Sequence, residues 1–524
     1  MYPIHTENDR FLCSEVYAPL PDGTRLYTRL IRPRGVDTCP CVVIRTPYEP
    51  ARRGVPYDLS SCGSDPFLSR GFALAIQHCR GCGDSEGAFK PYREEEDGLA
   101  LLAFLRDQAF YNGEFYLHGG SYLATVHLCY MARLPEDIKG ISLQIQTDRM
   151  YHRNYRCGCN YQWNNLIWWS MVLKRRFPDH TLSLPLKRPY LSAAEELFGQ
   201  PLPEYTDSLL HDTPDSYWTD DPRWEAITHL SVPILLVDGW YDYYLGGMMD
   251  MWTRLPARTR ARSAMIVGPY GHGTAVSGDA EYPLTNGNIP SDYSAAWFDN
   301  LRSGTPYPYA PLGRLTYYSI GSSVWRHGVY PPAWGERQML FLAPSGRLST
   351  EPSDAAPISY RYDPLHIHNC YRFGSAYRAH APHSLDGILS FIGPEAEREQ
   401  SYFGSLRVRL TVSSSCADTA FFARIYLVEE GESYNLTEAV GALSYFTDCY
   451  EPGSEITLEL DTTPIAFTLK KGSALRLDVS SESGVYLPHP NVKGHFALVD
   501  HTEVAENTLY PAKCCLILPL CEQA

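Results

Sequence analysis

The sequence lacks several features that would mark a membrane or nucleic-acid-binding protein. No uncharged apolar run approaches the roughly 18 residues that a membrane-spanning helix needs. The N-terminus has no basic start followed by an apolar stretch, so a secretory signal is not expected. Basic residues are in the minority, with 45 Lys and Arg against 60 Asp and Glu, and a net charge of −15 opposes binding to a phosphate backbone or an anionic membrane. We therefore expect a cytoplasmic protein with neither nucleic acid nor membrane as a partner.

Paired metal-binding motifs are also lacking. Cys79-Arg80-Gly81-Cys82 and Cys157-Gly158-Cys159 look like zinc half-sites, but neither has a second pair at a suitable spacing. The 15 cysteines are an odd number scattered along a chain that is long enough to fold without disulfides, so reduced thiols fit best. We expect no metal and no organic cofactor.

What is present is ordinary globular composition, enough for about three domains at roughly 150 residues each. Up to residue 145, continuous apolar runs alternate with helical patterns, and such runs resume at Ile234 and Ala264. Strands of this kind form a mostly parallel sheet covered on both faces. We therefore predict one α/β domain from 1–145 and 226–305, interrupted by a helical insertion at 146–225 that is rich in Trp and Tyr.

Beyond residue 305 the helical period largely disappears. Short alternating runs, such as those beginning at Leu406, Ala423 and Leu475, are separated by Gly, Ser and Pro turns. This pattern is typical of an all-β sandwich, which we predict for 306–524.

A candidate nucleophile lies at Ser121, where a predicted strand runs through Gly119 and Gly120 into a predicted helix. A nucleophile elbow needs small neighbours because its serine occupies a strained turn. The strict G-x-S-x-G pattern is not met, since Leu123 stands in place of the second glycine. Gly-Gly-Ser can equally be a plain turn.

The order of possible partners strengthens this interpretation. An α/β-hydrolase has its triad in the order Ser, acid, His, each on a loop after a strand. Asp238 and Asp242 follow the strand that begins at Ile234, and His272 follows the one that begins at Ala264. Asp242 is the preferred acid because it can reach outward along the loop, whereas Asp238 follows directly on the strand and suits a turn before glycine. We predict a Ser121–His272–Asp242 triad.

With these motifs the chain resembles the cocaine esterase and X-prolyl dipeptidyl-peptidase group of serine hydrolases. Similar motifs occur around the three triad positions, in Arg45-Thr46-Pro47-Tyr48, in the turn from Arg80 to Gly87 and near Tyr510. His78, Ala124 and Gly271 depart from the usual family residues. The resemblance implies an α/β-hydrolase domain, an inserted helical cap and a C-terminal jelly-roll sandwich. It also implies that the Tyr48 hydroxyl joins the backbone N–H of Tyr122 in an oxyanion hole.

The substrate is less sharply defined by the sequence. We predict acyl-ester hydrolysis through an acyl-enzyme, with a small ester or short peptide as substrate, and α-amino-acid esters belong to the candidate esters. X-prolyl dipeptidyl-peptidase or amide and β-lactam acylase activity, and a non-catalytic binding protein on a hydrolase scaffold, remain as alternatives. A homo-oligomer is compatible with the sequence. The aromatic residues predicted to line the substrate pocket are Trp163, Trp168, Trp169 and Trp240. Carboxylates in or near the cap are either candidates for binding a substrate amine or part of a solvated acidic face: Glu204, Asp207, Asp212, Asp215, Asp220 and Asp221.

Overall fold

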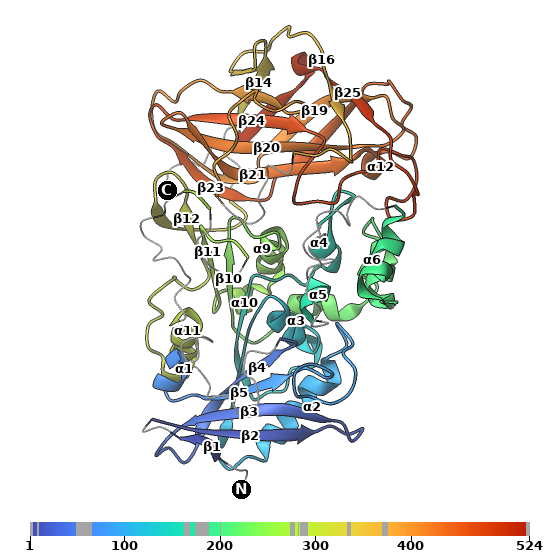
Figure 1. The fold of residues 1–524 in the computed structure, drawn as a ribbon. Coiled ribbons are helices and arrows are strands. Elements are labelled where there is room, and N and C mark those ends of the chain that lie inside the picture. Colours follow the sequence, from blue (N-terminus) through green and yellow to red (C-terminus); the bar gives the residue numbers. More distant parts are fainter. Residues whose placement is uncertain are drawn as a thin grey trace.

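The computed structural model describes most of the chain and shows two large sheets with a helical segment beside them (Figure 1). The first sheet lies in the half of the molecule that holds the N-terminus, and the second lies at the opposite end. The residues that the structure describes are 4–7, 10–48, 65–161, 168–172, 188–199, 201–272, 278–280, 282, 292–332, 337–368 and 376–519.

The first sheet is mostly parallel. Its strands follow the order β1-β2-β3-β5-β4-β6-β7-β10-β11-β12-β13. Neighbouring strands from β5 to β12 run parallel, while β1, β2 and β3 at one edge and β13 at the other pair antiparallel. The strands are β1 (Ile4–Glu7), β2 (Phe11–Pro19), β3 (Arg25–Pro33), β4 (Cys39–Thr46), β5 (Ala73–His78), β6 (Tyr111–Gly120), β7 (Ile138–Gln144), β10 (Ile234–Gly239), β11 (Ala264–Gly268), β12 (Leu315–Ser319) and β13 (Val324–Gly328).

Helices cover both faces of this sheet because successive strand residues point to opposite sides. Val43 and Leu236 pack with residues of α2, α3 and α9, whereas Val42 and Leu235 pack with residues of α1 and α11. The helices are α1 (Asp65–Ser69), α2 (Glu95–Arg106), α3 (Tyr122–Leu128), α9 (Leu245–Arg254), α10 (Ala257–Arg260) and α11 (Asp292–Ser303). The arrangement is the α/β-hydrolase sheet that the sequence predicts.

The helical insertion leaves the first sheet after β7 and returns at β10, so it extends from residue 145 to residue 233 rather than from 146 to 225. Its helices flank the space between the two sheets (Figure 1). We call this segment the cap. Its described elements are α4 (Met150–Asn154), β8 (Tyr155–Arg156), β9 (Cys159–Asn160), α5 (Trp168–Val172), α6 (Tyr190–Phe198), α7 (Pro203–Leu209), α8 (Ser216–Thr219) and a 3₁₀ helix (Pro222–His229).

The second sheet forms the C-terminal β domain, with a path of β16-β25-β19-β26-β14-β15-β17-β24-β20-β21. Strand β22 pairs with β19, and β18 and β23 form a separate two-stranded sheet. The elements are β14 (Arg337–Ala343), β15 (Arg347–Ser349), β16 (Ile358–Tyr362), β17 (Leu389–Ile392), β18 (Gln400–Gly404), β19 (Arg407–Ser414), β20 (Ala420–Glu429), β21 (Glu432–Ala442), α12 (Leu443–Phe446), β22 (Ile456–Asp461), β23 (Ile465–Leu469), β24 (Ala474–Ser480), β25 (Ala505–Leu509) and β26 (Cys515–Pro519).

The predicted boundary at residue 305 lies too early. Strands β12 and β13 belong to the first sheet, with Met265 of β11 opposite Leu315 of β12, so that sheet continues to Gly328. Both strands are short and resemble sandwich strands in sequence, because an edge hairpin and a sandwich strand share the same alternating period.

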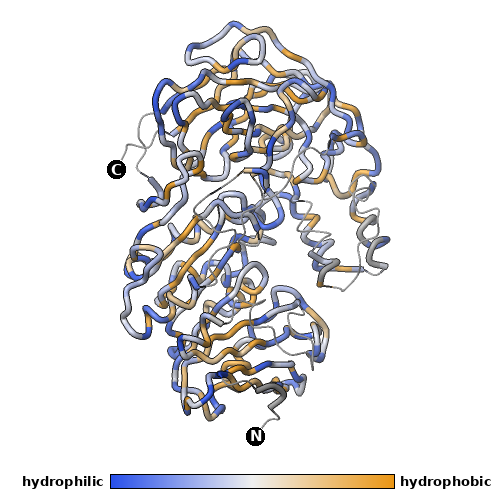
Figure 2. The backbone as a smooth tube through the Cα atoms, turned by 60° about the vertical axis from the view of Figure 1, so that its left-hand side comes forward, coloured by the Kyte–Doolittle hydropathy of each residue, from blue (hydrophilic) through white to orange (hydrophobic). Residues whose placement is uncertain are grey.

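Hydrophobic segments run along the strands of both sheets (Figure 2). Among the described residues, no helix combines the length and the apolar character that crossing a membrane requires.

Candidate active site

Ser121 occupies the sharp turn between β6 and α3. Its backbone has φ 54° and ψ −127°, a left-handed conformation that a residue other than glycine rarely adopts. A Cβ on Gly119 would lie 2.2 Å from the backbone oxygen of Leu123, so only glycine allows the helix to start this close to the strand. The turn therefore has the geometry of a nucleophile elbow although the second glycine of the motif is missing.

Two hydrogen bonds connect Ser121 to an imidazole and a carboxylate. Ser121 Oγ lies 2.9 Å from His272 Nε2, and His272 Nδ1 lies 2.6 Å from Asp242 Oδ2. The other oxygen of Asp242 accepts the backbone N–H of Tyr244 at 2.7 Å. The three residues follow β6, β10 and β11 at the same edge of the parallel sheet, where α/β proteins commonly place their binding sites.

Asp238 is buried on the strand side of this chain of hydrogen bonds. Its Oδ1 accepts the N–H of the adjacent Gly239 at 2.7 Å. Burial, and then the nearby charge of Asp242, hold the pKa of Asp238 well above its ordinary value. Burial thus favours the neutral form of Asp238, and Asp242 is the side chain that contacts the imidazole.

The serine and the imidazole open onto a cavity of about 140 Å³. Its lining is mostly aromatic, with Tyr243 stacked on the His272 ring at a centroid separation of 4.9 Å. Tyr244 meets the same ring edge-on at 5.4 Å, so the imidazole is held from two sides. The described lining residues are Tyr48, Tyr92, Ser121, Tyr122, Arg153, Asn154, Trp168, Tyr243, Tyr244 and His272.

Tyr48 follows β4, the strand next to β6, and its hydroxyl accepts a hydrogen bond from Trp168 Nε1 at 3.1 Å. Burial raises the pKa of Tyr48, so its phenol keeps its proton at neutral pH. Because the indole uses the phenol oxygen as an acceptor, the phenol O–H is left as a donor. Tyr48 can therefore donate to an oxygen in the cavity.

The Tyr122 hydroxyl is already engaged in hydrogen bonds with other residues, both as donor and as acceptor. Its hydroxyl donates to the buried Glu94 carboxyl and accepts the backbone N–H of Tyr92 at 3.0 Å. Burial raises the pKa of Glu94. Cys129 Sγ lies 3.5 Å from the second Glu94 oxygen, and Arg45 Nη1 donates to the Glu94 backbone oxygen at 3.0 Å. These contacts fix the first residue of α3, whose backbone N–H lies next to Ser121.

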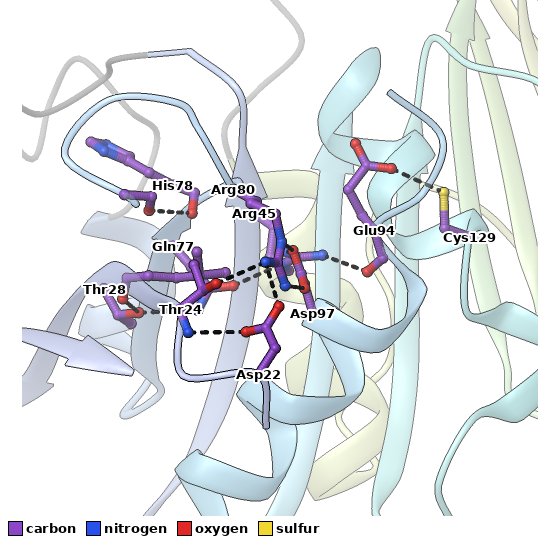
Figure 3. Close-up of polar contacts among 12 residues, drawn as sticks. Asp22, Thr24, Thr28, Arg45, Gln77, His78, Arg80, Glu94, Asp97 and Cys129 are labelled. Carbon is purple, nitrogen blue, oxygen red and sulfur yellow. Dashed lines mark hydrogen bonds and ion pairs between the residues drawn. The ribbon is translucent and has the colours of Figure 1, made fainter. Parts of the chain in front are cut away.

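The glycine-rich turn from Arg80 to Gly87 has a structural task (Figure 3). Arg80 binds both oxygens of Asp97 in α2, at 3.1 and 2.7 Å, and donates to Asp22 at 2.7 Å. A Cβ on Gly83 would lie 2.0 Å from the His78 ring, which explains how the turn accommodates this unusual histidine. The turn therefore joins α2 to the β2–β3 hairpin.

The predicted pocket tryptophans have different outcomes. Trp168 lines the cavity, whereas Trp163 lies outside the described residues. Trp169 is buried in the cap against Tyr205, with ring centroids 6.3 Å apart. Trp240 is also displaced from the cavity, because its Nε1 donates to the Tyr318 backbone oxygen at 2.6 Å and holds the ring under β12. Of the four predicted tryptophans, Trp168 is thus the one found in the described cavity lining.

Several cavity residues escaped the sequence analysis. Tyr243 and Tyr244 adjoin the predicted acid, and their position on that loop was an available signal. Arg153 and Asn154 lie at the end of the five-residue α4, for which no periodic pattern exists. Tyr92 precedes α2 without any recognisable motif, as does Glu94, which binds the Tyr122 hydroxyl behind the cavity wall.

Comparison with known proteins gives consistent matches along the chain. Residues 22–274 match the family model of X-Pro dipeptidyl-peptidase (S15 family), and residues 330–513 match that of the X-Pro dipeptidyl-peptidase C-terminal non-catalytic domain. A cocaine esterase of Rhodococcus sp. (strain MB1 Bresler) is 23% identical over 534 residues, covering 90% of this chain and 91% of its own.

Solved structures match over almost the full length. An α-amino acid ester hydrolase superposes with a TM-score of 0.84 at 18% identity, covering 98% of both chains. An aminopeptidase from a marine sediment Thaumarchaeota archaeon gives 0.85 at 17% identity, covering 99% of this chain and 98% of its own. At these identities the structural matches show a shared fold: an α/β hydrolase with a separate C-terminal β-rich domain.

Proposed function

Since the chain belongs to the serine hydrolase family of cocaine esterases and X-Pro dipeptidyl-peptidases, we propose that it cleaves acyl esters. In this proposal Ser121 is the nucleophile, His272 is the base and Asp242 is the acid that orients the imidazole. The observation that carries the proposal is the hydrogen-bonded chain from Ser121 Oγ to His272 Nε2 and from His272 Nδ1 to Asp242 Oδ2, at 2.9 and 2.6 Å. A positioned nucleophile, base and orienting group are the parts that acyl transfer needs.

In the proposed reaction, His272 Nε2 takes the proton of Ser121 as the serine oxygen forms a bond to the ester carbonyl carbon. The tetrahedral intermediate then collapses, the bond to the alcohol oxygen breaks, and the imidazolium returns its proton to the leaving alcohol. Water, deprotonated by the same imidazole, attacks the acyl-enzyme, the bond between the acyl carbon and Ser121 Oγ breaks, and the imidazolium returns the proton to the serine as the acid leaves. The Asp242 carboxylate stabilises the imidazolium in both steps.

The negative charge on the carbonyl oxygen would be held by the Tyr122 N–H and the Tyr48 O–H. Support for Tyr48 comes from its hydrogen bond with Trp168, which occupies the phenol oxygen as acceptor and leaves the proton for donation. Losing one donor of an oxyanion hole typically lowers turnover by about 10²–10³-fold. Tyr48→Phe should therefore lower kcat on a 4-nitrophenyl ester by roughly that factor and still allow labelling by a fluorophosphonate. Unchanged kcat would remove Tyr48 from the oxyanion hole.

Fluorophosphonate labelling tests the nucleophile directly. We expect the full-length protein to be labelled and to hydrolyse 4-nitrophenyl acetate, and Ser121→Ala to lose both while keeping its melting temperature. Ser142→Ala is a matched control, because Ser142 lies in β7 and its hydroxyl is hydrogen bonded to that of Ser294, away from the cavity. An unlabelled wild-type protein would favour a non-catalytic binding role, and a panel of acyl esters and Xaa-Pro anilides separates ester from peptide preference.

A further inference from the structure

The cavity at the proposed nucleophile contains a buried arginine. Arg153 lies in the last turn of α4 of the cap, is 5% exposed and lines the same cavity as Ser121 and His272. Among the ten described lining residues, it is the one with a permanent charge. That described lining contains no carboxylate. Asp242 lies behind His272, to which it is hydrogen bonded, and is not itself a lining residue.

The position of the Arg153 guanidinium is fixed by aromatic rings. It lies over the Tyr92 ring at 4.8 Å from the centroid and over the Tyr244 ring at 5.8 Å. Its Nη1 donates to Met150 Sδ at 3.6 Å, and the guanidinium also makes a hydrogen bond with the Tyr244 side chain. Cation–π contact with the tyrosine rings offsets part of the desolvation penalty of a buried cation. The N–H donors of a guanidinium lie in its plane, in a fork that matches a carboxylate.

The rest of the lining suits an anion as well. Asn154, next to Arg153 in α4, places an amide in the lining that donates to the Met150 backbone oxygen at 3.2 Å, and Tyr244 contacts both the Arg153 guanidinium and the His272 ring. A substrate ammonium group would instead need a carboxylate. The cap carboxylates that the sequence offered for that purpose do not appear in the described lining: Glu204, Asp207, Asp212, Asp215, Asp220 and Asp221.

We infer that Arg153 binds a carboxylate on the substrate, so that the preferred substrates are esters carrying a negative charge in either the acyl or the alcohol part. This inference rests on the proposed function for the reaction itself, and adds the substrate class. It assigns Arg153 as the residue that determines specificity for charge. The α-amino acid esters named for one structural relative carry the opposite charge on their amine, so this chain would differ from that relative in substrate.

Two matched substrate pairs test the inference on the full-length protein. Phenyl hydrogen adipate and phenyl methyl adipate differ by a carboxylate in the acyl part, and 4-acetoxybenzoate and its methyl ester differ by one in the alcohol part. We expect wild type to have the higher kcat/KM on the carboxylate member of at least one pair. Arg153→Met should lower that preference by about 10- to 100-fold, the range for losing a charged, forked hydrogen bond.

Two further variants separate local recognition from general charge and from misfolding. Arg149→Met removes a cation from the residue before α4, where Arg149 pairs with Asp250 and Glu225 outside the cavity, and should leave the preference unchanged. Arg153→Lys keeps the charge without the fork and should give an intermediate preference. An equal preference in wild type and Arg153→Met, or an equal loss in Arg149→Met, would overturn the inference.

A binding measurement keeps the inference distinct from the catalytic proposal. Adipate should quench tryptophan fluorescence through Trp168 and slow fluorophosphonate labelling in wild type, whereas neutral adipamide should do neither. Adipate that acts no differently from adipamide would overturn the inference. A protein that binds adipate but is never labelled would refute the proposed nucleophile and keep Arg153 as a carboxylate site.

Discussion

At the scale of single residues, the site separates two neighbouring aspartates by their surroundings. Asp242 has one oxygen on His272 Nδ1 and accepts the backbone N–H of Tyr244 with the other. Asp238 is fully buried, and its pKa is raised by burial and by Asp242. Two carboxyls four residues apart thus have different surroundings, and burial favours the neutral form of Asp238.

This difference predicts unequal effects of two identical substitutions. Asp242→Asn should lower kcat/KM for a small ester by about 10²–10⁴-fold, because an amide no longer stabilises the imidazolium. Asp238→Asn replaces a neutral acid by a neutral group of the same shape and keeps an acceptor for Gly239, so kcat/KM should change little. Steady-state kinetics with melting curves for both variants provide the measurement. An Asp238→Asn enzyme as impaired as Asp242→Asn would contradict the assignment.

At the scale of elements, the elbow depends on how closely β6 and α3 approach. A methyl group at position 119 would collide with the α3 backbone, whereas one at position 120 would meet its nearest atom at 3.6 Å, an ordinary contact. Gly119→Ala should therefore lower the free energy of unfolding by about 1–3 kcal/mol and slow labelling of Ser121. Gly120→Ala is the matched control and should be close to wild type in chemical denaturation. Equal stability of the two variants would show that α3 can move away from the strand.

Element by element, the sequence predicts the parallel sheet well and its edges poorly. The strands around Val42, Leu117 and Leu236 are continuous apolar runs because both of their faces are buried, and loops after such strands meet at one edge. For this reason the order of Ser121, Asp242 and His272 along the chain was enough to predict the candidate site. Strands β12 and β13 lack such runs, and Arg153 depends on tertiary placement of a helix too short to show a period.

At the scale of the whole molecule, the cap is attached to the β domain next to the cavity. Arg156 of β8 donates to Thr463 Oγ1 at 2.9 Å and to the Asp461 backbone oxygen at 2.8 Å. Tyr161 stacks on Tyr486 with ring centroids 4.7 Å apart. Since β8 directly follows α4, these contacts also restrict the position of α4 and therefore of Arg153 in the cavity wall.

Removing this attachment should affect substrate binding from a distance. Arg156→Ala should raise KM more than it lowers kcat, because the wall moves while the triad stays on the sheet, and should lower the melting temperature. Arg409→Ala serves as the control, since it breaks an exposed pair with Glu459 in the β domain, worth at most about 1 kcal/mol. Kinetics of both variants on one ester decide the matter, and identical KM values would show that the β domain does not hold the cap.

The hydrogen bond from Trp168 to Tyr48 has a consequence for how such an enzyme can diverge. The indole belongs to the cap, which lines the cavity, and the phenol follows β4 of the first sheet, which also holds the proposed triad. Under the proposed function, a change in the cap that admits a new substrate can also rotate the phenol that would receive the developing charge. A single change in the cap would then alter both substrate selectivity and turnover. Adaptation to a new ester would therefore require compensating changes in the residues that follow the strands of the sheet.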